Sequence, residues 1–94
     1  MITVQRVDDG GALSFEVVVR EGKGETRHSV TMSEVKCQQL TGGKHTPERC
    51  IEAAFRFLLD REPKESILAR FDISVISRYF PEFEQELPRY LAQF

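Results

Sequence analysis

The sequence predicts an α+β fold: a three-stranded antiparallel β-meander at the N-terminus, followed by three to five α-helices packed on one of its faces. Apolar and polar residues alternate in the first third, glycine-containing turns separate the alternating stretches, and the remainder shows helical spacing. Because 94 residues are enough for one hydrophobic core, we expect a single domain over residues 1–94, with the sheet in 1–32 and the helical part in 33–94.

The meander is predicted from three stretches, ITVQRV (2–7), LSFEVVVR (13–20) and ETRHSVTM (25–32). Asp9-Gly10 is a two-residue turn signal between the first two, and EGKG (21–24) joins the second and third because glycine adopts turn conformations at little cost. The apolar face of the middle stretch consists of Leu13, Phe15, Val17 and Val19.

The segment TMSEVKCQQLTGG predicts a short helix. Thr31 or Ser33 can accept a hydrogen bond as its N-cap, and Gly42-Gly43 is typical of a helix end. We expect this helix to bury Val35 and Leu40.

The segment HTPERCIEAAFRFLLDRE predicts the clearest helix. Thr46 is its expected N-cap and Pro47 its first residue, where proline is well tolerated. We expect this helix to be central, with the sheet on one side and the C-terminal helices on the other. Its apolar stripe, at positions i, i+3, i+4 and i+7, consists of Ile51, Ala54, Phe55 and Leu58.

The last third predicts shorter elements separated by prolines. A helix or turn after Pro63 should present Ile67, Leu68 and Phe71, and the mixed charges of 60–66 suit either a solvated connection or a polar docking loop. Asp72 can cap the next helix, and Pro81 should begin another, in which Pro88 must produce a kink or an end. The apolar positions of these two helices are Ile73, Ile76 and Phe80, then Phe83, Leu87, Tyr90 or Leu91, and Phe94.

Residues 66–80 resemble, in outline, the turn and second helix of a DNA reader, with Arg70 and Arg78 as nucleic-acid contacts. The small residue is out of register, however, and three glutamates follow Pro81, where they would face phosphate. A nucleic-acid-binding regulator with a degenerate helix-turn-helix-like segment is therefore the alternative function rather than the preferred one.

Composition and charge limit the function classes. The net charge of −2 offers no broad positive field for nucleic acid or anionic lipid. Neither a membrane-spanning apolar run nor a secretory signal is visible, and two cysteines do not make a disulfide framework. We expect no membrane association and a cytoplasmic location.

No catalytic or metal-binding residues are assigned from the sequence, and no cofactor is expected. His28, Cys37, His45 and Cys50 lack the spacing of zinc ligands, and both cysteines fall inside predicted helices, where a thiolate gains little. A weak anion site is conceivable at Lys44, His45 and Thr46, just before a helix N-terminus, but no phosphate-binding loop precedes it.

An interaction function remains. The chain has seven phenylalanines and two tyrosines, and Tyr79, Phe83, Tyr90 and Phe94 form an interface if they stay outside the core. The stretch 25–32 is also an open sheet edge that could pair with a second copy. The preferred function is a non-enzymatic binding or adaptor protein with a protein partner or self-association, including a homodimer.

The segment REPKESILARFDISVISRYFPEFE (61–84) resembles that of small uncharacterised bacterial proteins, which also begin with a strand-rich half. The resemblance extends over most of the chain and implies a bacterial, cytoplasmic protein. It implies no activity, ligand or catalytic residue.

Overall fold

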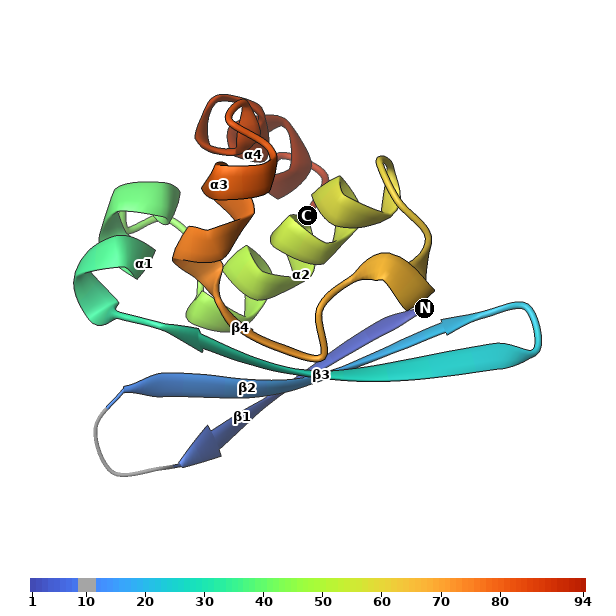
Figure 1. Cartoon of the computed structure of the whole chain (residues 1–94). Coiled ribbons are helices and arrows are strands. Elements are labelled where there is room, and N and C mark those ends of the chain that lie inside the picture. Colours follow the sequence, from blue (N-terminus) through green and yellow to red (C-terminus); the bar gives the residue numbers. More distant parts are fainter. Residues whose placement is uncertain (9–11) are drawn as a thin grey trace.

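A computed structural model describes residues 1–8 and 12–94, and its core is a four-stranded mixed sheet covered on one face by helices (Figure 1). The expected turn at Asp9-Gly10 lies outside the described residues. The strands, in their spatial order, are β1 (Ile2–Asp8), β2 (Leu13–Glu21), β3 (Gly24–Met32) and β4 (Arg70–Asp72). The α+β class and the antiparallel pairing of β1, β2 and β3 are confirmed.

The fourth strand corrects the prediction of a three-stranded sheet. β4 comes from the part of the chain predicted to be helical and pairs with β3 in parallel, so that Val30 lies opposite Phe71. The Ser29 amide donates to the Ala69 carbonyl over 2.8 Å, and the Thr31 hydroxyl donates to Asp72 over 2.7 Å. The edge of β3 that we expected to be open is therefore partly paired within the chain, which satisfies its backbone groups.

One face of the sheet forms one side of the core. In the register of β2 and β3, Phe15 lies opposite Val30 and Val17 opposite His28, and all four are buried. The alternation read from the sequence thus assigned the inner face of β2 correctly.

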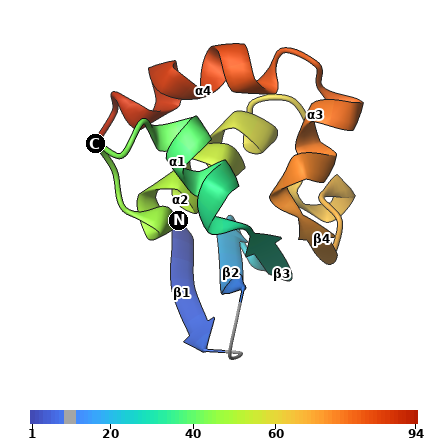
Figure 2. The ribbon, with the colours of Figure 1, turned by 90° about the vertical axis from the view of Figure 1, so that its left-hand side faces the viewer.

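All the helices lie on that inner face, and α4 is farthest from the sheet, with α2 beneath it (Figure 2). The central position predicted for α2 is confirmed. The helices are α1 (Glu34–Thr41), α2 (Pro47–Leu59), α3 (Ile76–Tyr79) and α4 (Phe83–Leu91), with one-turn 3₁₀ helices at Lys64–Ser66 and Ile73–Val75.

α2 begins and packs as its sequence predicts. The Thr46 hydroxyl accepts from the Arg49 amide over 3.1 Å, and Pro47 is the first helical residue. Ile51, Phe55 and Leu58 are buried in the centre of the core.

In α1 the prediction is half right. Ser33 is the N-cap, Gly42 ends the helix with a φ of 64°, and Leu40 is buried. Val35, however, is 69% exposed. A helix of two turns buries only one narrow side, which here contains Cys37, and Val35 lies outside that side.

The proline-rich C-terminal part also differs in detail. Asp72 caps the 3₁₀ turn at 73–75 by accepting from the Ser74 amide, as expected of a cap. Helix α4 starts at Phe83 rather than at Pro81, and it continues through Pro88 to Leu91. Proline removes one amide donor from the helix, and the packing of the buried apolar side of α4 outweighs that loss. Among the described residues, no helix is long and apolar enough to span a membrane.

Candidate binding site

An apolar pocket of about 390 Å³ lies between the C-terminal end of α2, the segment 66–71 and α3; we call it the α2–α3 pocket. Its floor consists of four buried residues, Leu58, Ile67, Phe71 and Ile76. Its rim consists of more accessible residues, Glu62, Ser66, Leu68, Val75, Tyr79 and Phe80. Two rim residues are large and apolar yet exposed: Leu68 by 46% and Tyr79 by 67%.

One wall of the pocket is held in place by the sheet. Nδ1 of His28 lies 2.7 Å from the Leu68 carbonyl, and its Nε2 lies 2.8 Å from the Thr26 hydroxyl. A carbonyl only accepts, so Nδ1 carries the proton and donates to Leu68. Since His28 is 2% exposed and its ring packs at a tilt against Phe55, it connects the core to the backbone at the pocket rim. The sequence, in which His28 was considered as a metal ligand, could not identify this partner.

Glu62 is the one carboxylate among the lining residues. Burial alone raises the pKa of its side chain, and the carboxylate forms no hydrogen bond or ion pair with any residue in the described parts of the chain. It therefore adds an uncompensated negative charge, at neutral pH, to an otherwise apolar rim.

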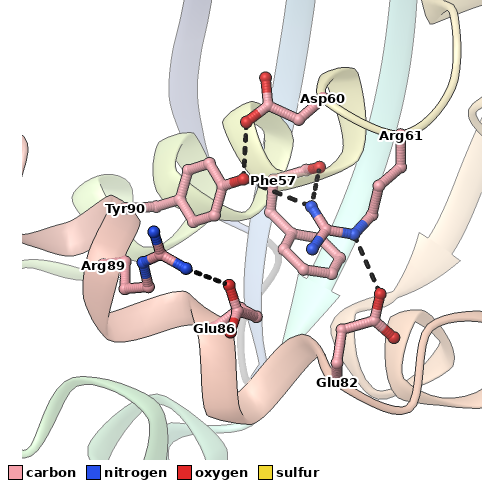
Figure 3. Close-up of polar contacts among 7 residues, drawn as sticks. All are labelled: Phe57, Asp60, Arg61, Glu82, Glu86, Arg89 and Tyr90. Carbon is pink, nitrogen blue, oxygen red and sulfur yellow. Dashed lines mark hydrogen bonds and ion pairs between the residues drawn. The ribbon is translucent and has the colours of Figure 1, made fainter.

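The neighbouring cation, Arg61, is engaged elsewhere, as Figure 3 shows. Its guanidinium lies 3.7 Å from the centre of the Phe57 ring, and it donates to Glu82 over 3.1 Å and to the Tyr90 hydroxyl over 3.3 Å. The Tyr90 hydroxyl in turn donates to Asp60 over 2.6 Å. These contacts join α4 to the end of α2 and keep Arg61 from neutralising Glu62.

The four aromatic residues proposed as an interface do not gather on one surface. Phe83 is fully buried, with its ring packed edge-on against Phe57, so it contributes to the core and is removed from the interface set. Tyr90 is half-buried and hydrogen-bonded as described above. Phe94 is 38% exposed and lies under the guanidinium of Arg56, at the C-terminus, on the side of the molecule opposite α3 (Figure 2).

Tyr79 alone of the four belongs to the α2–α3 pocket. Its side chain projects from the last turn of α3, and its hydroxyl has no hydrogen-bond partner among residues 1–8 and 12–94.

The segment 66–80 is not a helix-turn-helix. It contains the end of a 3₁₀ turn, the strand β4, a second 3₁₀ turn and the four-residue helix α3. The residues just before Asp72 pair with β3 as strand β4, so the first helix of the motif does not form. Arg70 and Arg78 are both exposed, but they are not presented on a recognition helix.

The segment proposed as an anion site forms an ordinary helix start. The Thr46 hydroxyl already accepts from the Arg49 amide, and the Lys44 amide donates to the Thr41 carbonyl over 3.2 Å. Lys44 is exposed and His45 is half-buried.

The two cysteines are free and buried. Burial raises the pKa of the Cys50 thiol to about 12 and also raises that of Cys37. Both thiols therefore stay protonated at neutral pH, which makes them poor nucleophiles.

Sequence reasoning missed the pocket because its residues come from separated segments and differ in exposure. Leu68 was grouped with Ile67 and Phe71, which are buried, and nothing in the local pattern distinguishes it. Glu62 was noted only within the charged stretch 60–66, and its missing counter-charge is visible only in three dimensions.

Comparison of the chain with models of protein families, with curated proteins and with solved structures found no significant match.

Proposed function

We propose that this chain is a non-enzymatic binding protein whose α2–α3 pocket receives an apolar segment of another protein. The observation that supports this most directly is the combination of a buried apolar floor with two large exposed apolar residues, Leu68 and Tyr79, at its rim. Exposed apolar surface beside a concave site is typical of a docking surface, and tyrosine is among the residues enriched there.

The chemistry of the pocket favours binding over catalysis. Its polar groups are few: one carboxylate, Glu62, and the hydroxyls of Ser66 and Tyr79. A general base or nucleophile needs a second group that orients or activates it, and none of these three is hydrogen-bonded to another lining residue in the described chain.

A second copy of the chain is a less suitable occupant than a different protein. Self-association was expected through the edge of β3, and β4 pairs part of that edge internally. Nucleic acid is also less suitable, since the described residues that line the pocket include one carboxylate and no lysine or arginine.

Affinity selection of displayed 16-residue peptides against the full chain tests the proposal. Leu68→Glu and Tyr79→Ala should each weaken the selected peptides more than tenfold, because one places a charge at the apolar rim and the other removes a large contact. Val35→Glu is the matched control, since it adds the same charge at another exposed apolar residue and should leave the affinity unchanged.

Selected peptides that bind Leu68→Glu as well as the unaltered chain would refute this site. Light scattering after size exclusion tests whether a second copy of the chain occupies the pocket. A dimer that Leu68→Glu dissociates would mean that a second copy, rather than another protein, occupies the pocket.

A further inference from the structure

We infer that the segment bound by the α2–α3 pocket is an amphipathic α-helix that carries one lysine or arginine among its apolar anchors, with this cation against Glu62. The inference rests on the proposed function and specifies the partner. It follows from three features of the pocket: the uncompensated charge of Glu62, the hydrogen bonds that its backbone groups already form, and its volume.

The charge at the rim favours a cation in the partner. Glu62 is partly removed from water, and the two nearest cations in the sequence are both engaged: Arg61 with Glu82, and Lys64 with Glu65 over 2.8 Å. Lys64 is moreover packed beside Gly24, the first residue of β3. A partner's ammonium or guanidinium group would form a charge-assisted hydrogen bond with a carboxylate that has no competing partner in the described chain.

The end of helix α2 strengthens this preference. Glu62 follows the last turn of a thirteen-residue helix, and its amide donates to the Leu58 carbonyl over 2.9 Å. The C-terminal end of a helix carries a partial negative charge, which attracts cations and disfavours anions. The guanidinium of Arg61 offsets part of this charge by donating to the Phe57 carbonyl over 3.2 Å, so Glu62 is the main source of repulsion for an acidic partner segment.

The backbone of the pocket wall favours a helix over an added strand. Strand addition needs a row of unpaired amides and carbonyls. Within the segment 66–71, the amides of Ser66 and Ile67 already donate hydrogen bonds within the chain, and the carbonyls of Leu68 and Ala69 already accept them. A helix satisfies its own backbone and presents only side chains, so it can fill this wall without leaving polar groups unpaired.

The size of the pocket limits the contact to a few side chains. A volume of 390 Å³ is near the lower end of the range of about 300–1,000 Å³ found for ligand sites. Apolar residues at i, i+3 or i+4, and i+7 of a helix would reach the floor and the two exposed rim residues, and a lysine or arginine beside them would reach Glu62.

A helical peptide library tests the inference. Leucine is fixed at four positions with the i, i+3, i+4, i+7 spacing, eight other positions are randomised, and selection is run in parallel against the unaltered chain, Glu62→Gln and Glu65→Gln. Glu65→Gln is the matched control, because Glu65 is a nearby carboxylate that does not line the pocket.

We expect lysine or arginine to be enriched at one position relative to the leucines, against the unaltered chain and Glu65→Gln but not against Glu62→Gln. Replacing that basic residue by glutamine should weaken binding roughly fivefold for the unaltered chain and by less than about twofold for Glu62→Gln. Affinity for the unaltered chain should also fall as the pH is lowered until Glu62 is protonated, and this dependence should disappear in Glu62→Gln.

The possible failures are distinguishable. Peptides that bind, and that Leu68→Glu abolishes, without a preferred basic position would overturn the inference and leave the proposed function standing. Enrichment of basic residues that persists against Glu62→Gln would likewise assign the cation to another site. If no peptide of any charge binds, the proposed function itself is refuted.

Discussion

Comparing the stability of Tyr90→Phe with that of Tyr79→Phe distinguishes a tyrosine whose hydroxyl stabilises the fold from one whose hydroxyl does not. Both changes remove one hydroxyl oxygen and leave the ring. The Tyr90 hydroxyl donates to Asp60 over 2.6 Å and accepts from Arg61 over 3.3 Å (Figure 3), whereas no described residue contacts the Tyr79 hydroxyl through a hydrogen bond.

The expected loss for Tyr90→Phe is about 1 kcal/mol in the free energy of unfolding. A hydrogen bond to a charged group contributes about 1.5–3 kcal/mol, and its loss costs most where the remaining partner is buried. Asp60 is exposed and water can replace the lost donor, while Arg61 retains its contacts with Glu82 and the Phe57 carbonyl. The estimate therefore falls below that range. Tyr79→Phe should change stability by less than about 0.5 kcal/mol.

Urea unfolding followed by circular dichroism measures the free energy of unfolding of both variants. In thermal unfolding, a 1 kcal/mol loss lowers the melting temperature by about 4–8 °C in a domain of this size. Equal stability of the two variants would refute the assignment of Tyr90 to a stabilising contact. A loss above about 3 kcal/mol for Tyr90→Phe would show instead that the phenyl ring is displaced from Phe57.

Three further predictions concern the thiols, the cap of the 3₁₀ turn and the proline in α4. Because Cys50 has a pKa of about 12 and is fully buried, it should react with a disulfide reagent at pH 8 only after unfolding in guanidinium, and the rate should be measured by absorbance. Burial opposes the ionisation of Asp72, but hydrogen bonds from Ser74 and Thr31 keep its pKa below the usual value. Its contribution to stability is thus present at neutral pH and is lost as the pH falls below about 4, a dependence that Asp72→Asn should flatten in urea titrations at several pH values. Pro88→Ala should stabilise the fold by about 1 kcal/mol in thermal unfolding, since it restores an amide donor inside α4 at an exposed position.

The elements that were predicted well are those in which the spacing of apolar residues depends on burying one side of the element. β2 alternates because one of its faces packs on the helices, and the stripe of α2 marks the side that is buried. The helix caps at Ser33 and Thr46 were also predicted, because a capping side chain accepts a hydrogen bond from an amide only three residues later.

The elements that were missed depend on contacts between distant segments. β4 has three residues, too few for an alternation to appear, and it is a strand only because β3 offers unpaired groups beside it. Val35 and Leu68 are apolar in segments where apolar residues are usually buried, and only the packing of the whole chain leaves them outside.

The same principle explains why the candidate site was not predicted. The centre of a binding surface is apolar, like the interior of the protein, so residue type alone does not distinguish the two. The sequence identified the C-terminal aromatic residues as a group, and the structure divides them: Phe83 completes the core, Tyr90 joins two helices, and Tyr79 is left at the rim of the pocket.

The α2–α3 pocket is preformed rather than assembled around a ligand, because its irregular wall is tied to the most regular part of the molecule. His28 and the Ser29 amide, both on β3, hold the carbonyls of Leu68 and Ala69, so the rim follows the sheet rather than moving as a free loop. A partner of the kind proposed would then have little loop-ordering cost to overcome, so that a small apolar contact would be enough for useful affinity. The arrangement also explains why a histidine lies buried in the middle of an apolar strand face: its Nδ1 donates to the Leu68 carbonyl, which lies at the edge of the core.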